Sequence, residues 1–461
     1  MKYISTRGGI SPVGFKDAVM MGLATDGGLI LPESIPHLGP ETLDTWRELP
    51  YRQLAYRIMS LFATDIPEDD LERLINRSYD SFDNKEITPV VRENGVYILE
   101  LFHGPTLAFK DVALQFLGNL FEYLLKERGE RMNIVGATSG DTGSAAIYGV
   151  RGKENINIFI LHPHLKTSPI QALQMTTVLD PNVHNVAVRG TFDDCQNIVK
   201  ALFNDLSFKE KYALGAVNSI NWARVLAQVV YYFYAWFRVT DAGGSDVVFS
   251  VPTGNFGDIF AGYVAKQMGL PVKRLLLATN ENNILTRFIN VGDYSVGDVV
   301  PTLSPSMDIQ VASNFERYLY YLFGENPVRV VAAFDHFAQT GRMEFTNAEL
   351  ARVRAEFCSR SIDRADTIAT IAAFRKETGY LLDPHTAVGV RAAQVCTAPG
   401  ETPVCLATAH PAKFGEAVEA ATGIAPPFPP SLAGIEKLPA RCEILDGNLD
   451  LIKSFIEKKA L

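Results

Sequence analysis

Two glycine-rich turns in this sequence have the composition of anion-binding loops. Residues 137–143 read ATSGDTG and residues 252–258 read PTGNFGD, and each lies between an apolar run of strand length and a helical pattern. Glycine lets the backbone approach a ligand closely, and the first amides of a helix favour an anion. Neither turn matches a nucleotide-binding phosphate loop or a GxGxxG fingerprint. A phosphate other than that of ATP or NAD is the better interpretation, and a plain strand-to-helix turn is the alternative for either loop alone.

A lysine at the beginning of a predicted helix could supply a reactive amine. Lys110 follows the segment LFHGPTLAF and precedes a periodic apolar helix at 112–126. A cation at a helix start opposes the macrodipole, and the preceding Leu-Ala-Phe indicates local desolvation. Both effects favour the neutral amine that covalent chemistry with a carbonyl requires. The ordinary alternative is a solvated lysine at a helix end.

A third segment, NSINWAR at residues 218–224, also marks a strand-to-helix boundary. Its asparagine and serine residues, Asn218 and Ser219 among them, could cap the helix. Arg224, one turn into the helix, could reach a bound anion with its forked guanidinium. Simple capping beside a surface arginine is the alternative interpretation.

The elements that would position these residues alternate between strands and helices. From Val96 onward, apolar runs of strand length are followed by glycine-rich turns and helical patterns, which is typical of a parallel sheet. We expect strands at 133–138, 156–161, 185–188, 247–251, 275–279 and 404–408. Helices are expected at 46–62 and 68–81, and from Ser144, Thr191 and about Asp258. Thr191 with Asp194 three residues later predicts a helix cap.

The length of 461 residues predicts two or three lobes. We expect an N-terminal lobe at 1–95, a smaller α/β domain at 96–240 that contains Lys110 and the SGDTG loop, and a larger α/β domain at 241–461 that contains the GNFGD loop. The polar, glycine-rich residues 241–246 are the candidate linker. These boundaries are approximate, because segments are expected to cross between lobes.

Composition excludes several classes of function. The net charge of -9 argues against a surface that neutralises nucleic-acid or lipid phosphates. The most apolar stretch, 225–237, is interrupted by Gln228 and is too short to span a bilayer, so it predicts a buried helix. The five cysteines lack CxxC spacing and the N-terminal residues show no targeting pattern, which together predict a cytoplasmic protein.

Metal and hydrolase chemistry also lack support in the sequence. His103, His385 and His410 show no metal-ligand spacing with one another, and no serine or cysteine stands in a nucleophile elbow. We therefore predict no metal site.

Together, these segments resemble the threonine synthases, and in particular the longer microbial and fungal branch of that family within the fold-type II pyridoxal-phosphate (PLP) enzymes. The match extends from STRG at 5–8 and GLATDGGL at 22–29 to DPHTA at 383–387 and ATAHPAKF at 407–414. The resemblance implies an α/β fold of the tryptophan synthase beta type. It implies two parallel-type α/β domains, a mostly helical N-terminal lobe, and a cofactor between the domains.

The resemblance implies a role for each candidate residue toward PLP. Lys110 would carry the cofactor covalently and act as catalytic base, and Thr408 would meet the pyridine nitrogen. Backbone amides would hold the cofactor phosphate at Gly254, Asn255, Phe256 and Gly257. Asp141 would flank the phenolic oxygen. Many fold-type II relatives have asparagine at that place, and an aspartate donates a hydrogen bond only when protonated.

Substrate contacts follow from the same resemblance. The residues that match the loop for the substrate carboxylate are Ser139, Gly140 and Thr142. The residues that match the segment for the substrate phosphate are Asn218, Ser219 and Arg224.

The implied activity is that of a carbon-oxygen lyase that acts on a phosphorylated substrate. It would convert O-phospho-L-homoserine and water into L-threonine and phosphate by γ-elimination and β-addition, the last step of threonine biosynthesis. The alternatives are another fold-type II lyase, such as a threonine dehydratase or a β-replacing synthase, and a catalytically silent PLP-binding relative. The only expected partner is the small-molecule substrate, with no nucleic acid and no membrane, and both a monomer and a homodimer are compatible with the sequence.

Overall fold

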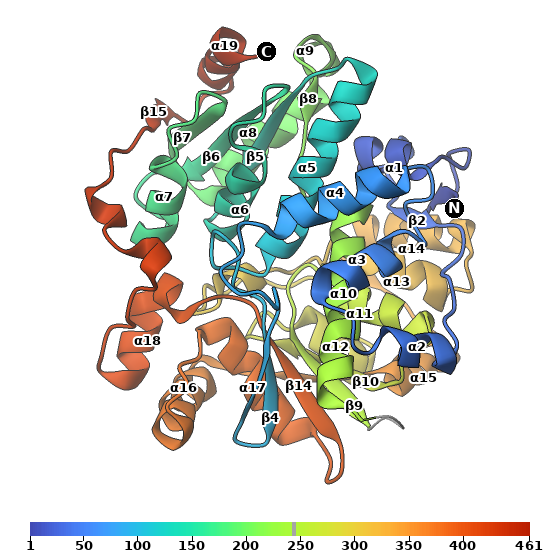
Figure 1. The fold of residues 1–461 in the computed structure, drawn as a ribbon. Helices are drawn as coiled ribbons and strands as arrows, with labels where there is room; N and C mark the ends of the chain where they lie inside the picture. The colour runs from blue at the N-terminus through green and yellow to red at the C-terminus, as the bar shows by residue number, and fades with distance from the viewer. Residues whose placement is uncertain (242–245) are drawn as a thin grey trace. The chain divides into compact units, whose positions relative to one another are not determined.

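The computed structural model, drawn in Figure 1, describes residues 1–241 and 246–461. The described residues group into two compact units. Unit 1 comprises residues 1–76, 82–103 and 219–426, and unit 2 comprises residues 77–81, 104–218 and 427–461. Each unit is thus assembled from segments that are not consecutive in the chain. The three-lobe division with boundaries at 95 and 240 stays a prediction, and residues 242–245 of the predicted linker lie outside the described residues.

The sheet of unit 1 is parallel apart from an antiparallel strand at one edge. Its order is β13-β10-β9-β14-β4-β3, and β3 runs antiparallel to β4. The strands are β3 (Val90–Glu93), β4 (Val96–Glu100), β9 (Val247–Pro252), β10 (Val272–Thr279), β13 (Phe357–Ser361) and β14 (Thr402–Ala407). The predicted strands at 247–251, 275–279 and 404–408 are confirmed, although β14 ends one residue earlier than predicted.

Helices cover both faces of this sheet. On β10, Leu276 belongs to a buried cluster with residues of α17 (Pro384–Cys396). The neighbouring Leu275 lies against Gly262 of α11 (Gly257–Gln267). Because successive side chains of a strand point to opposite faces, α17 and α11 pack on opposite sides of the sheet.

The apolar stretch at 225–237 is a buried helix, as predicted. It lies within α10 (Trp222–Val239), where each residue from Trp222 to Phe237 is buried. The ring of Tyr232 occupies the space that a side chain at Gly262 would need, so α10 and α11 approach closely there. In the part of the chain that the structure describes, no helix is long and apolar enough to cross a membrane.

The N-terminal segment contains helices, short strands and loops, and one of its two predicted helices is wrong. In place of a helix at 46–62 the chain forms α2 (Pro40–Trp46) and α3 (Tyr51–Met59), with Pro50 as the N-cap of α3. Proline restricts the preceding residue to extended conformations, which separates the two helices. The helix predicted at 68–81 is confirmed as α4 (Glu68–Tyr79).

The remaining elements of unit 1 are short strands and surrounding helices. They are β1 (Tyr3–Ser5), α1 (Phe15–Met21), β2 (Ile30–Pro32), α12 (Ile284–Val291), β11 (Tyr294–Ser295), α13 (Phe315–Leu322), α14 (Pro327–Thr340), β12 (Arg342–Met343), α15 (Asn347–Glu356), α16 (Arg364–Thr378) and α18 (Gly415–Thr422).

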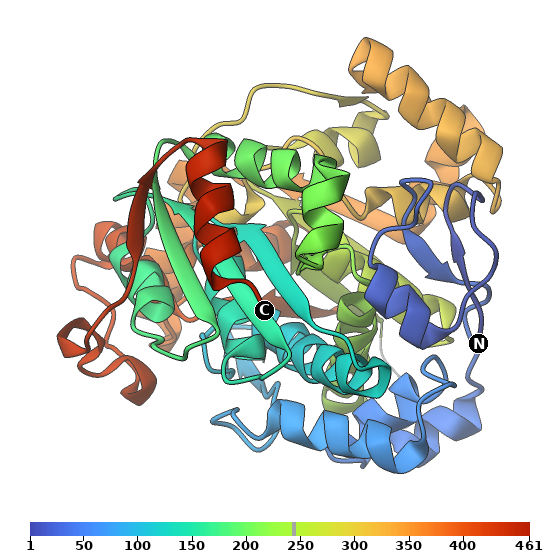
Figure 2. The same ribbon diagram turned by 90° about the horizontal axis from the view of Figure 1, so that it is seen from above.

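Unit 2 is built on a second, parallel sheet of order β15-β7-β6-β5-β8. Its strands are β5 (Met132–Ala137), β6 (Ile156–Pro163), β7 (Val183–Arg189), β8 (Leu214–Gly215) and β15 (Glu443–Asp446). Its helices are α5 (Lys110–Arg128), α6 (Asp141–Val150), α7 (Pro169–Thr176), α8 (Phe192–Asn204), α9 (Leu206–Lys211) and α19 (Leu449–Lys459). The predicted strands at 133–138, 156–161 and 185–188 are confirmed. Figure 2 shows the red C-terminal strand and helix beside the green and teal strands of this sheet.

Local signals set the helix starts in unit 2. Thr191 and Asp194 form the predicted cap at the start of α8, with the Thr191 side chain accepting from the Asp194 amide and the Asp194 side chain accepting in return. The helix after the SGDTG loop begins at Asp141, three residues before the predicted Ser144. Lys110 is the first residue of α5, as predicted.

Candidate active site

Lys110 begins α5 in unit 2, and its amine is largely removed from solvent. Only 9% of the residue is exposed, so the alternative of a solvated lysine is wrong. Its Nζ lies 3.9 Å from the Asp141 Oδ2 and 4.7 Å from the centre of the Phe109 ring. The predicted position at a helix start and the predicted desolvation are both confirmed.

Asp111 fixes the loop that leads into Lys110. Its Oδ2 accepts from the Thr106 amide at 2.8 Å and its Oδ1 accepts from the Thr106 hydroxyl at 2.7 Å. A side chain at Gly104 would meet the Asp111 Cβ at 2.4 Å, and Leu107 has a φ of 60°. The sequence analysis did not single out Asp111, although its place directly after Lys110 at a helix start was a usable signal.

The SGDTG loop lies at the start of α6, also in unit 2. The Thr138 hydroxyl accepts from the amides of Gly140, at 3.0 Å, and Gly143, at 2.9 Å, which folds the loop onto the end of β5. Ser139 is exposed and Thr142 is half-buried. The loop thus presents polar side chains, while the Thr138 hydroxyl holds its backbone.

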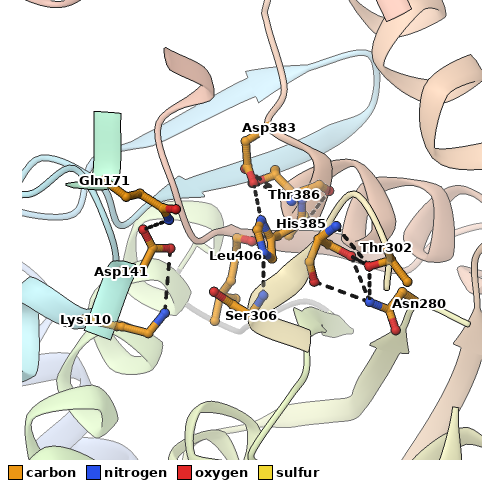
Figure 3. Close-up of polar contacts among 12 residues, drawn as sticks. Lys110, Asp141, Gln171, Asn280, Thr302, Ser306, Asp383, His385, Thr386 and Leu406 are labelled. Carbon is orange, nitrogen blue, oxygen red and sulfur yellow. Dashed lines mark hydrogen bonds and ion pairs between the residues drawn. The ribbon is translucent and has the colours of Figure 1, made fainter. Parts of the chain in front are cut away.

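Asp141 stands between an amine and an amide. Figure 3 shows Asp141 between Lys110 and Gln171, whose Nε2 donates to the Asp141 Oδ1 at 2.7 Å. The Lys110 Nζ approaches one carboxyl oxygen of Asp141, and Gln171 binds the other. The structure therefore brings Lys110 and Asp141 together within unit 2. Gln171 of α7, a residue that the sequence analysis missed, holds the other side of the Asp141 carboxyl group.

Replacement of Gly140 by alanine is expected to destabilise the protein by about 3 kcal/mol. Gly140 has a φ of 153°, and a Cβ there would lie 2.5 Å from the Gln171 Cδ and Oε1. The methyl group would strain the backbone and push Gln171 away from Asp141. Urea unfolding of the native protein and the variant measures the loss.

Gly379→Ala is the matched control for that experiment. Gly379 has a φ of 81°, and among the described residues no atom lies within 4 Å of a Cβ built there. It should lose only about 1 kcal/mol, the cost of the backbone conformation alone. If the two variants lose the same free energy of unfolding, the contact with Gln171 does not contribute to the loss at Gly140.

The GNFGD loop forms the turn between β9 and α11 in unit 1. Phe256, the N-cap of α11, has a φ of 63°, a left-handed conformation that is unusual for a bulky side chain. Its buried ring packs against Phe315 and Phe357, at centroid distances of 5.4 and 6.0 Å, which stabilises that conformation. A Cβ at Gly254 would lie 2.6 Å from the Ser306 carbonyl oxygen. The turn is therefore close-packed at Gly254, and it leads into α11, whose first amides have no partner within the helix.

Arg224 lies one turn into α10, in unit 1, and is buried. The helix is capped by the Asn221 side chain, which accepts from the Ala223 amide at 3.0 Å, so the predicted capping by this segment is confirmed for Asn221. Only 5% of Arg224 is exposed, which makes the surface-arginine alternative wrong.

Among the described residues, the Arg224 Nε and Nη1 have no hydrogen-bond partner. Burial lowers the pKa of Arg224 to about 10, so the guanidinium stays charged at neutral pH. A buried cation with unsatisfied donors is costly unless an anion pairs with it. This arrangement fits an anionic ligand group.

Thr408 and His385 lie on the carboxyl side of the unit 1 sheet. Thr408 follows the last residue of β14 and is buried. The His385 Nε2 accepts from the Ser306 amide at 3.3 Å (Figure 3), so its Nδ1 carries the proton and donates to the Asp383 Oδ1 at 2.9 Å. The turn at Ser306, which packs on Gly254, is thereby tied to α17. The sequence analysis considered His385 only as a metal ligand and as part of the DPHTA motif that also contains Asp383, and it missed their support of this turn.

No group of three or more potential metal ligands occurs among residues 1–241 and 246–461.

Comparisons with known proteins agree on one family. Three family models match the chain: "Threonine synthase N terminus" at residues 2–79, "Pyridoxal-phosphate dependent enzyme" at 84–344 and "Threonine synthase, C-terminal" at 386–456. The curated threonine synthase of Pseudomonas aeruginosa is 48% identical over 99% of this chain and 98% of its own length.

Solved structures give the same result. The PLP-bound threonine synthase from Brucella melitensis has a TM-score of 0.97 at 45% identity and covers 100% of this chain and 99% of its own. The threonine synthase from yeast has a TM-score of 0.95 at 44% identity and covers 99% and 98%. The expected fold-type II architecture is therefore confirmed.

Proposed function

This chain belongs to the threonine synthase family of PLP-dependent enzymes, and on that premise we propose which of its residues perform the family's reaction. The chain is a lyase of threonine biosynthesis with PLP as its cofactor. We propose that it converts O-phospho-L-homoserine and water into L-threonine and phosphate. The observation that supports this substrate is Arg224, a buried cation whose Nε and Nη1 have no partner among the described residues. A dianionic phosphate would satisfy both donors.

The residues present fit PLP. The GNFGD turn leads into the first backbone amides of α11, and Gly254 packs so closely on Ser306 that a side chain would not fit there. We propose that Gly254, Asn255, Phe256 and Gly257 hold the cofactor phosphate and that Thr408 meets the pyridine nitrogen. When bound, PLP supplies an electron sink for the negative charge that develops on the substrate.

Lys110 is the proposed catalytic base and the covalent attachment point for the cofactor. Its buried amine would take the Cα proton of the substrate and return protons in later steps. Asp141, at 3.9 Å, would hold the amine in place, and Gln171 would orient Asp141. The contact of Asp141 with the cofactor's phenolic oxygen stays a prediction.

The substrate would be held at both of its charged ends. We propose that Ser139, Gly140 and Thr142 bind its carboxylate. Asn218, Ser219 and Arg224 would bind its phosphate and retain that group as it leaves. A lyase that acts on an uncharged side chain has no use for a buried guanidinium at this place, which favours the phosphorylated substrate over that of a dehydratase.

The test is the release of products from O-phospho-L-homoserine by the purified, PLP-loaded protein. We expect L-threonine and inorganic phosphate in equal amounts, measured by amino-acid analysis and a colorimetric phosphate assay. L-threonine and O-acetyl-L-serine are the comparison substrates. Ketobutyrate from threonine would transfer the activity to a dehydratase, and replacement products from O-acetylserine would indicate a β-replacing synthase. No product from any of the three would identify a silent relative.

Further predictions concern the setting in which the enzyme works. We propose a cytoplasmic location, since the cysteines of the described chain are free thiols, as is typical of a reducing compartment. The net charge of -9 gives no support to a nucleic-acid partner. A monomer and a homodimer both stay compatible with the sequence.

A further inference from the structure

Asn314 is a fully buried amide that contacts two separate backbone segments of unit 1. It is the N-cap of α13, with an exposed fraction of 0%. Its Nδ2 donates to the carbonyl oxygens of Ser219 and Asn255, each at 3.2 Å. Its own backbone amide also donates to the Asn255 carbonyl at 3.0 Å. The side-chain amide has two hydrogens, so one reaches each carbonyl.

Arg317 fixes the orientation of this amide. Its Nη1 donates to the Asn314 Oδ1, its Nη2 donates to the Ile220 carbonyl, and its Nε donates to the Ile30 carbonyl at 3.0 Å. A guanidinium has donors and no acceptors, so the oxygen of Asn314 must face Arg317 and the nitrogen must face the two carbonyls. Arg317 is itself fully buried, and its fork leaves the Asn314 side chain a single arrangement.

The two carbonyls belong to the two proposed phosphate-binding segments. Ser219 lies in the segment at 218–224 that we assign to the substrate phosphate, and Asn255 lies in the loop that we assign to the cofactor phosphate. Two further contacts add to the link. The Ser219 hydroxyl lies 3.0 Å from the Ser313 hydroxyl, and a Cβ at Gly257 would lie 3.1 Å from the Asn314 Nδ2. Among these contacts, the Asn314 side chain is the one that binds both segments.

We propose that Asn314, oriented by Arg317, is a positioning residue that fixes the distance between the substrate-phosphate segment and the cofactor-phosphate loop. It acts through the backbone of Ser219 and Asn255, whose peptide planes carry the neighbouring amides. Binding of both phosphates then depends on the same side chain, because a displacement of about 1 Å at a positioned group is enough to lower activity about 100-fold. This inference rests on the proposed function.

The test is Asn314→Asp in the full-length enzyme. Aspartate keeps an oxygen for Arg317 and places its second oxygen against the Ser219 and Asn255 carbonyls. Both side-chain donor contacts are therefore lost with almost no change in shape. We expect the Kd of PLP, measured by absorbance titration of the apoenzyme, to rise at least about tenfold. The KM for O-phospho-L-homoserine at saturating PLP should rise by a similar factor, with a smaller change in kcat. Asn314→Ala, which removes the donor and adds no charge, should shift both constants in the same direction.

Asn182→Asp in unit 2 is the matched control. Asn182 is also buried, with 8% exposed, and its Nδ2 donates to the carbonyls of Val150, Lys153 and Ile156. This variant should lower the midpoint of thermal unfolding and leave the PLP Kd and the substrate KM within about twofold of native values. A merely structural role for Asn314 predicts the same pattern as the control.

The outcomes separate this inference from the proposed function. If both Asn314 variants leave the two constants near native values, or move them no further than Asn182→Asp does, the positioning role is overturned. If Arg224→Met raises the substrate KM while the Asn314 variants do not, the positioning role fails and the phosphate assignment stands. If Arg224→Met leaves the KM unchanged, the phosphate assignment fails, and a weakened PLP Kd in Asn314→Asp would then support only the contact with the cofactor loop.

Discussion

Lys110→Ala is expected to lower the turnover of O-phospho-L-homoserine by at least about 10⁴-fold. The amine that the variant loses is buried at the first residue of α5, beside the Asp141 carboxylate. Alanine removes both the proposed proton carrier and the covalent attachment of PLP, and these losses act on the same step. Phosphate release measured over several hours at high enzyme concentration would detect the residual rate.

Lys126→Ala is the matched control for this experiment. Lys126 lies near the other end of the same helix, and its Nζ reaches the Glu122 Oε1 at 3.4 Å. Its removal should leave turnover within about twofold, since the Lys126 side chain is exposed and the buried Glu122 keeps Arg77 and Lys153 as partners. A chemical readout is independent of rate: borohydride should fix PLP to the Lys110 peptide of the native protein and to no peptide of Lys110→Ala. More than about 1% of native turnover in the lysine variant would contradict the assignment.

Local patterns allowed much of the fold to be predicted from the sequence. Strands such as β6 and β9 are mostly apolar because both faces of a parallel sheet are covered, and that pattern is readable without the structure. The cap at Thr191 and Asp194 could be predicted because both partners lie within one turn. The prediction of a helix at 46–62 was wrong because it relied on the pattern of apolar residues and ignored Pro50. The ring of a proline disfavours a helical conformation of the residue before it.

The parts of the site that depend on distant residues could not be predicted. Gln171 reaches Asp141 from 30 residues away, and Asn314 reaches Ser219 from 95 residues away. Each is a single polar side chain whose local sequence indicates only a helix or a cap. The loops themselves were visible because glycine and helix starts mark them locally. Burial of Arg224 was also undecided, since its neighbours suit a capped surface helix as well as a buried one.

Two buried arginines of unit 1, Arg224 and Arg317, give the second large prediction. Replacement by methionine should change the stability of the apoprotein in opposite directions at the two positions, and at Arg224 it should also lower activity. Arg224→Met is expected to lower kcat/KM for O-phospho-L-homoserine about 100-fold, mainly through KM. Charge-assisted hydrogen bonds to a phosphate contribute about 3 kcal/mol, and that energy corresponds to this factor. A dehydratase acting on threonine would tolerate the change, so the size of the loss also discriminates between the two activities.

The same variant should be more stable than the native protein when no ligand is bound. Arg224 is a buried cation with donors that have no partner among the described residues, and an apolar side chain of similar length avoids that cost, with a gain of about 1–3 kcal/mol. Arg317→Met should instead destabilise the protein by at least about 3 kcal/mol, because it leaves the acceptors at Ile30, Ile220 and Asn314 without their donor.

Thermal unfolding of the apoproteins must be compared in a buffer free of phosphate and sulfate, since either anion could pair with Arg224. A native protein that binds phosphate through Arg224 should gain stability when phosphate is added, and Arg224→Met should gain less. If Arg224→Met is instead destabilised as strongly as Arg317→Met, Arg224 has a structural partner, and its proposed role in holding the substrate phosphate is wrong.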